Sequence, residues 1–192
     1  MSHYQRNTNG WSPGNEKLGP IPNWSILPIV NCPGSSERCR DICYAAKFAR
    51  WPTVKSLWES NQNRHIGELP EGTTVARIHV SGDFHSATYI QEWILFVQAH
   101  PQVRFWTYTR SWAVPALLPA LEELRAQPNV QLFASVDTSM PDPPAGWRTA
   151  YLDDDPRATG LHCLEQVGKV RDCNTCKYCI RPLPGNVIFK EH

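Results

Sequence analysis

The sequence predicts an α/β fold built around a parallel β-sheet. Short, nearly continuous apolar segments recur between residues 75 and 152, and segments of helical periodicity separate them. Strands that are apolar on both faces are typical of a covered parallel sheet, and their alternation with helices is typical of βα units. The 192 residues suffice for one hydrophobic core, so we expect a single domain.

The first half of the chain is predicted to contain two strands and two helical regions. The apolar segment Trp24–Val30 is consistent with a buried strand. Residues 43–69 are mostly helical in character, and Pro52 is expected to interrupt them. A strand is expected over Val75–Val80. The next helix is expected over Ala87–His100, and Ser86 is suited to cap it.

The same order of strand and helix then repeats. We expect a strand over Val103–Thr109, a helix over Val114–Gln127, and strands over Val130–Val136 and Trp147–Leu152. These elements form an α/β core over residues 1–155, which includes an irregular N-terminal arm and the first cysteine loop. Periodicity ends near Pro156, so residues 156–192 are predicted to be a cysteine-rich, metal-binding extension packed on the same domain.

Composition limits the classes of function. The formal net charge is +1, which gives no overall basic surface, although a local patch keeps a nucleic-acid partner open. The polar start lacks an apolar signal region, and no apolar run approaches the roughly 18 residues of a membrane span. We therefore expect a cytoplasmic protein without a membrane partner.

Seven cysteines form two groups separated by about 120 residues. An odd number excludes complete disulfide pairing, and clustered thiols in a reducing compartment favour metal binding. Either each group holds its own metal centre, or one centre draws ligands from both groups. The first group contains Cys32, Cys39 and Cys43, and the second contains Cys163, Cys173, Cys176 and Cys179.

The two groups differ in what they can hold. The second has the spacing C-x9-C-x2-C-x2-C, and four thiolates complete either a tetrahedral zinc site or a [4Fe-4S] cluster. The C-x2-C-x2-C run favours the cluster, and zinc remains the alternative. The first has the spacing C-x6-C-x3-C between a predicted strand and a helix. Three thiolates leave one iron of a cubane open to a small-molecule ligand, and the helix N-terminus suits an anionic cluster.

Several motifs together resemble the uncharacterised phage gene product 88 family. They are NCPGSSERCRDICYA, HVSGDFHS, FWTYTR, ASVDTS and the C-x2-C-x2-C tail, and they extend from about Asn31 to the end of the chain. This resemblance brings no known activity. It implies a bacteriophage protein, which would act in the cytoplasm of the host cell.

A three-cysteine loop after the first strand also resembles the radical S-adenosylmethionine (radical SAM) superfamily, although its usual spacing is C-x3-C-x2-C. That resemblance implies a partial parallel (βα) barrel, S-adenosylmethionine bound at the open iron, reductive cleavage of that molecule and an electron donor. It also implies that Gly82 and Asp83 stand where a Gly-Gly-Glu type turn holds the amino group of S-adenosylmethionine.

Three polar residues are predicted at carboxyl ends of parallel strands, on the same rim as the first cysteine loop, where ligands bind in such sheets. Asp83, Arg110 and Asp137 are therefore catalytic candidates; a helix cap, a surface ion pair and a turn residue are their respective alternatives. His79 and His85 flank Asp83 as possible ligands or structural histidines. Basic residues near the tail cysteines are expected to offset thiolate charge: Lys169, Arg171, Lys177 and Arg181.

These observations favour an iron–sulfur protein with a radical-SAM-like core. Such a protein either cleaves S-adenosylmethionine or is a non-catalytic relative of enzymes that do. The alternative is a zinc-stabilised interaction or nucleic-acid-binding module.

Overall fold

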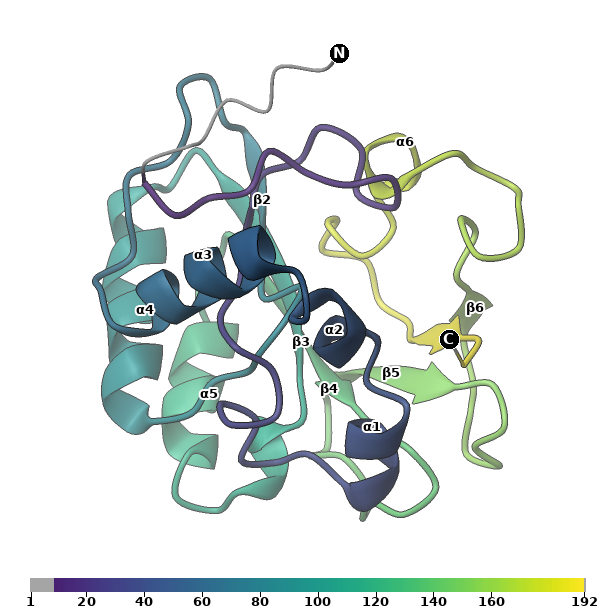
Figure 1. Cartoon of the computed structure of the whole chain (residues 1–192). Coiled ribbons are helices and arrows are strands. Elements are labelled where there is room, and N and C mark those ends of the chain that lie inside the picture. Colours follow the sequence, from purple (N-terminus) through teal and green to yellow (C-terminus); the bar gives the residue numbers. More distant parts are fainter. Residues whose placement is uncertain (1–8, 192) are drawn as a thin grey trace.

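A seven-stranded parallel sheet forms the centre of the computed structural model, which describes residues 9–191 (Figure 1). The predicted α/β class with a parallel sheet is confirmed. The strand order is β1-β2-β3-β4-β5-β7-β6, and every neighbouring pair is parallel. The strands are β1 Asn23–Trp24, β2 Val75–Ile78, β3 Arg104–Thr109, β4 Val130–Ser135, β5 Arg148–Leu152, β6 Leu161–His162 and β7 Val187–Phe189.

The sheet is open within the described residues. Strands β1 and β6 lie at its two edges and do not pair with each other. The radical-SAM-like barrel is therefore not confirmed. The helices are α1 Glu37–Asp41, α2 Tyr44–Phe48, α3 Pro52–Gln62, α4 Ala87–Ala99, α5 Leu118–Arg125 and α6 Cys173–Cys176, with a 3-10 turn η1 at Ser111–Ala113. None of the helices in residues 9–191 has the length and apolar character to cross a membrane.

One face of the sheet is covered by α4 and α5 (Figure 1). The predicted helix after Ser86 is confirmed, and the Ser86 hydroxyl accepts a hydrogen bond from the Tyr89 amide at 3.2 Å. Trp93 and Ile94 of α4 are fully buried in one cluster with Ile78, Phe105 and other alternate residues of the strands. Each such side chain stabilises the fold by about 1.5–3 kcal/mol.

The opposite face is covered by the cysteine-rich tail, which includes the short helix α6, and by Leu18 and Ile21 of the N-terminal arm. Trp106 and Phe133 point to this side, where Cys179 and Ile180 pack against the sheet. The tail also supplies β6 and β7, although its sequence shows little periodicity. These strands are two and three residues long, which is too short for a visible alternation pattern.

Two boundaries in the first half are set by proline. The predicted strand Trp24–Val30 ends at Trp24, and a turn follows in which the Val30 amide donates to the Pro28 carbonyl at 2.8 Å. Ile29 in this turn has a φ of 69°. The predicted interruption at Pro52 is confirmed, because α3 begins there. The first residue of a helix donates no intrahelical hydrogen bond, so the N–H that proline lacks is not needed at this position.

Candidate functional site

The first cysteine loop lies against the carboxyl ends of β3 and β4. Ser36 caps α1 by accepting from the Cys39 amide at 2.9 Å, and its hydroxyl donates to Asp137 Oδ2 at 2.6 Å. Gly34 approaches the Arg110 carbonyl so closely that a Cβ would overlap it. The loop and the rim residues are therefore one structural unit, in which Ser36 joins a cysteine-bearing helix to a buried carboxylate.

Asp83 is buried beneath this loop and its carboxylate is fully occupied. Oδ1 accepts from the Phe84 amide at 2.8 Å and the Thr109 hydroxyl at 2.6 Å; Oδ2 accepts from the amides of Arg110 at 2.8 Å and Ser111 at 3.2 Å. A carboxylate offers about four lone-pair positions, and all are used. Burial raises the pKa of Asp83, and these hydrogen bonds oppose that rise. Its visible role is to fasten the β2 end to the β3 end.

Gly82 has a packing reason to be glycine. Its φ is 77°, and a Cβ at this position would overlap Cγ1 of Ile26. Gly82 and Asp83 therefore form a tight turn that packs against Ile26, and this packing accounts for the glycine.

Asp137 and Arg110 form a buried ion pair on the rim. Arg110 donates to Asp137 Oδ2 at 2.6 Å, and the side chains are 11% and 0% exposed. Oδ1 accepts from the Ser139 amide at 2.9 Å and the Ser139 hydroxyl at 2.6 Å. Burial alone would raise the pKa of Asp137, but the hydrogen bonds from Ser139 and Ser36 and the charge of Arg110 hold it below its usual value. The structure thus connects all three predicted rim residues, since Arg110 also bonds Asp83 through its amide.

The three thiols of the first loop influence one another electrostatically. Cys32, Cys39 and Cys43 are partly buried, and each of the three pairs interacts. Burial, followed by the charge of Asp83, raises the pKa of Cys32 to about 12. Burial also raises the pKa of Cys39, and Arg110 opposes that rise. A metal cation would relieve the cost of ionising these thiols.

The tail contains a second mutually interacting set of three thiols. Cys163, Cys173 and Cys179 interact in all three pairs, and α6 carries Cys176 three residues after Cys173. Burial raises the pKa of Cys173 to about 12 and that of Cys179 to about 11. Asp172 caps α6 by accepting from the Thr175 amide at 2.7 Å, which fixes this short turn.

Three cations surround the tail thiols, and each lies over an aromatic ring. The Arg77 guanidinium is 4.3 Å from the Tyr108 ring and the Arg148 guanidinium is 4.1 Å from the Phe133 ring. Lys17 Nζ is 5.1 Å from the Phe189 ring. Arg77 lowers the pKa of both Cys173 and Cys179; Lys17 acts on Cys173 and Arg148 on Cys179. These three cations favour ionised thiols in the tail, although Lys17 also pairs with Glu165 at 3.3 Å.

These three cations are not the basic residues expected from the sequence. Arg171, one of the expected residues, pairs with Asp172 at 3.0 Å, and the cations that act on the thiols come from β2, β5 and the N-terminal arm. A usable signal was present for Arg77, since an arginine interrupts the apolar segment Val75–Val80.

The two candidate histidines differ in burial. His79 is buried, its Nε2 lies 2.9 Å from the Tyr89 hydroxyl, and its ring packs edge-on against Phe84. Burial lowers its pKa to about 3, so the imidazole stays neutral. His85 stacks on Tyr89 with 4.6 Å between ring centroids. Both rings thus belong to an aromatic cluster around Tyr89.

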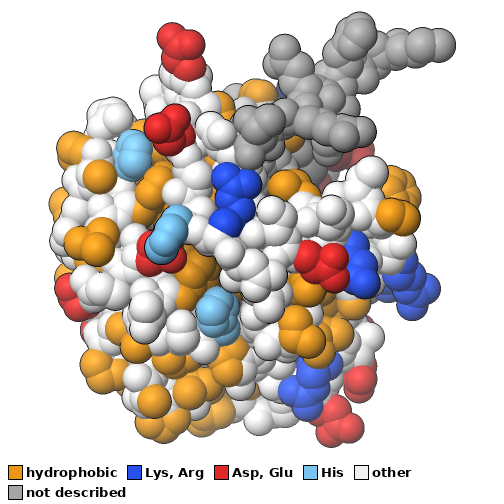
Figure 2. Space-filling view, turned by 60° about the vertical axis from the view of Figure 1, so that its left-hand side comes forward, with side chains coloured by type: hydrophobic (Ala, Val, Ile, Leu, Met, Phe, Trp, Pro, Cys, Tyr) orange, Lys and Arg blue, Asp and Glu red, His pale blue; other side chains and the backbone are white. Residues whose placement is uncertain are grey.

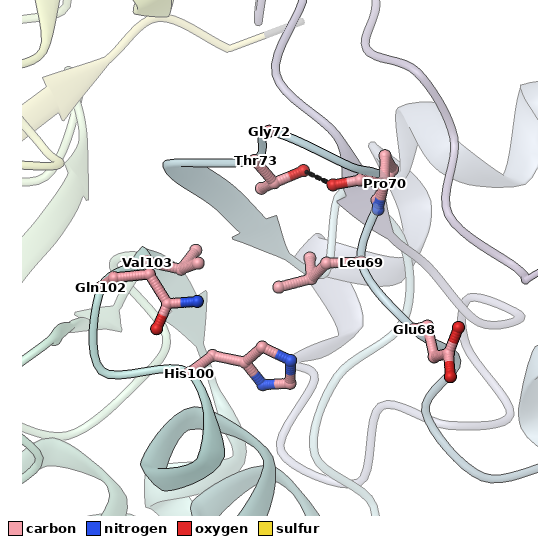
Figure 3. A pocket seen from close by; sticks show the side chains of 8 residues that line it. All are labelled: Glu68, Leu69, Pro70, Gly72, Thr73, His100, Gln102 and Val103. Carbon is pink, nitrogen blue, oxygen red and sulfur yellow. Dashed lines mark hydrogen bonds between the residues drawn. The ribbon is translucent and has the colours of Figure 1, made fainter.

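Metal coordination is not preassembled among the described side chains. No group of three or more His, Cys, Asp or Glu residues in residues 9–191 is arranged around a single ion position. A cavity of about 380 Å³ lies elsewhere, open at the amino ends of β2 and β3 (Figure 3). It contains none of the predicted site residues and is lined by Glu68, Leu69, Pro70, Gly72, Thr73, His100, Gln102 and Val103.

Comparison with known proteins gives a family but no activity. The profile of the Gene product 88 family matches residues 3–182. The Gene 88 protein of Mycobacterium phage L5 is 27% identical over 135 residues, covering 57% of this chain and 55% of the relative. The Gene 88 protein of Mycobacterium phage D29 is 25% identical over 162 residues, covering 71% of this chain and 64% of the relative.

These alignments span less than two thirds of either relative. No solved structure is similar to the chain. The family model nonetheless covers nearly the whole sequence, including both cysteine groups up to Cys179. The resemblance to the phage family is confirmed, and the chain belongs to the Gene product 88 family.

Proposed function

We propose that this protein binds iron–sulfur clusters at two separate centres. The observation that carries the proposal is the presence of two sets of three partly buried, mutually interacting thiols. Their surroundings differ, because one set faces the ion pair of the rim and the other faces three cations. This difference favours two centres over one centre that draws ligands from both groups.

The spacing of the thiols supports clusters over zinc. A single zinc ion requires four ligands at about 2.3 Å from one point, so its sulfurs must converge tightly. A cubane binds each thiolate at a different iron, so its cysteine sulfurs lie farther apart than those around a single zinc ion. The C-x2-C-x2-C run of the tail is the spacing with which bacterial ferredoxins bind the irons of a cubane.

Local charge supports an anionic group at the tail. A cluster held by four thiolates carries net negative charge, and the charges of Arg77, Arg148 and Lys17 favour ionised thiols in this set. Lys17 also pairs with Glu165 at 3.3 Å, so Arg77 and Arg148 carry most of this argument. Cys163, Cys173, Cys176 and Cys179 would hold a closed cluster, and the three cations would stabilise it. In the first set, Cys32, Cys39 and Cys43 would leave one iron open to a small molecule.

Radical SAM chemistry is the finer part of the proposal. When bound at an open iron and reduced, S-adenosylmethionine can be cleaved to a carbon radical; an electron donor is then required. The Asp83 carboxylate has no free lone pair, so we do not assign it the amino group of S-adenosylmethionine. Asp137 and Arg110 position the loop through Ser36. A non-catalytic cluster protein accommodates the same contacts.

Anaerobic purification followed by iron, zinc and inorganic sulfide analysis tests the proposal. We expect iron and sulfide in equal amounts and absorption in the visible region. Stoichiometric zinc without sulfide would overturn it and favour the zinc-stabilised module. Electron paramagnetic resonance of the reduced protein with and without S-adenosylmethionine tests the finer part, since an unchanged spectrum and no cleavage would leave only the cluster.

A further inference from the structure

The turn between α2 and α3 exposes two neighbouring aromatic side chains. Phe48 is 49% exposed and Trp51 is 62% exposed. Their ring centroids are 6.4 Å apart, with an interplanar angle of 66°. The Trp51 amide donates to the Phe48 carbonyl at 3.0 Å, and Pro52 begins α3 immediately afterwards. The backbone therefore holds both rings at the surface in a defined arrangement.

The surroundings of these rings are basic. Lys47 and Arg50 are exposed, and neither forms an ion pair with a described residue. Residues 42–58 contain three basic residues and no Asp or Glu, in a chain with a net charge of +1. The third basic residue, Lys55, pairs with Glu59 at 3.4 Å. Two unpaired cations therefore flank two exposed rings.

We propose that Phe48, Trp51, Lys47 and Arg50 form a binding surface for single-stranded nucleic acid. Unpaired bases stack on aromatic side chains whatever their sequence, and basic side chains follow the phosphates. The aromatic area consists of only two rings, and the two exposed cations are their neighbours in the chain. A stable protein–protein interface buries about 800 Å² of total surface on each side, which two aromatic rings do not supply. Charge and shape together thus favour a polynucleotide.

The surface adjoins the first cysteine loop. Tyr44 follows Cys43 and interacts with both Cys39 and Cys43, and its ring centroid is 6.4 Å from that of Phe48. Three rings thus lead from the thiols to the surface. Figure 2 shows one face of the molecule, on which hydrophobic side chains are spread over the left and lower parts and most basic side chains lie on the right. Binding to this surface needs no metal, so it can be tested independently of the proposed function.

Fluorescence anisotropy with labelled oligo-dT and oligo-rU of about 12 nucleotides at low salt tests the surface. We expect both to bind comparably, because phosphates and base faces are common to DNA and RNA, and duplex DNA of the same length to bind more weakly. Trp51→Ala and Phe48→Ala should each weaken binding about tenfold. Replacing Lys47 and Arg50 by Gln should weaken binding and reduce its salt dependence by about 0.7 log units per lost phosphate contact.

Leu95→Ala is the matched control, since Leu95 is 60% exposed on α4 and lies outside the surface. All four side chains of the surface are exposed, so the variants should keep the melting temperature of the wild type. No binding to either oligonucleotide, equal losses in Leu95→Ala and Trp51→Ala, or equally strong displacement by an acidic polypeptide would each overturn the proposal. Iron and sulfide analysis of the same samples separates the two proposals: clusters without binding refute the surface alone, and binding without clusters refutes the cluster alone.

Discussion

Replacing Asp137 by Ala should both destabilise the protein and release the first cysteine loop. The carboxylate accepts four hydrogen bonds, from Ser36, from Arg110 and twice from Ser139. Its removal leaves Arg110 with a buried charge and no carboxylate partner on the rim. Removing one partner of a buried ion pair costs about 3–5 kcal/mol, so we expect the free energy of unfolding to fall by that amount.

Urea denaturation followed by circular dichroism measures this loss, with Asp142→Ala as the control. Asp142 pairs with Arg157 at 3.1 Å but is 87% exposed, so its loss should cost less than about 1 kcal/mol. Alkylation of Cys39 should also become faster in Asp137→Ala, because Ser36 no longer fixes α1 to the rim. Equal stability of the two variants, or unchanged alkylation of Cys39, would refute the role of the Ser36–Asp137 hydrogen bond in fixing the first cysteine loop to the rim.

The contribution of Asp137 should depend on pH in a defined direction. Its folded pKa lies below its usual value, so the carboxylate is more easily ionised in the native state. Its stabilisation is therefore complete above the unfolded pKa of about 3.9 and is lost as pH falls through the lower folded value. The difference in stability between the wild type and Asp137→Ala should be constant near neutrality and shrink below about pH 4. A difference that grows on acidification would contradict the shift.

Three further substitutions test other contacts. Gly82→Ala should lower the free energy of unfolding by more than Gly146→Ala does. Both glycines have a positive φ (77° and 78°), but of these two only Gly82 lies against another side chain, that of Ile26; equal losses in thermal denaturation would refute the packing contribution. Thr109→Val should cost about 1.5–3 kcal/mol, since it removes a donor to a buried carboxylate, and a neutral result would mean that Asp83 is satisfied without it. Arg77→Gln should further raise the pKa of Cys173, so alkylation of this thiol in chelator-treated protein at pH 9 should slow; an unchanged rate, read by mass spectrometry, would show that Arg77 does not act on it.

The sequence was informative where a local pattern and the tertiary structure agree. The helix after Ser86 and the strands of the 75–152 region follow from periodicity that the core also requires. The positions of Asp83, Arg110 and Asp137 on one rim follow from the parallel arrangement, because residues that end parallel strands meet at one edge. The hydrogen-bond partners of these residues could not be predicted from the sequence, because a partner such as Ser36 lies 101 residues from Asp137.

Other features depend on contacts that the sequence does not reveal. Strand β7 is three residues long and is defined by pairing on both sides with β5 and β6. The cations around the tail thiols come from three separate segments, so sequence proximity suggested Arg171 where the fold uses Arg148. The extent of β1 is limited by the turn at Pro28, although the residues around it are apolar.

The proposed function assigns two separate centres to different cysteine groups. Iron and inorganic sulfide should therefore be measured in the wild type, in the variant that replaces Cys32, Cys39 and Cys43 by Ala, and in the variant that replaces Cys163, Cys173, Cys176 and Cys179 by Ala. We expect about eight irons and eight sulfides per wild-type chain and about four of each in either variant. Zinc without sulfide in the wild type, or loss of all metal in both variants, would refute the two-centre assignment.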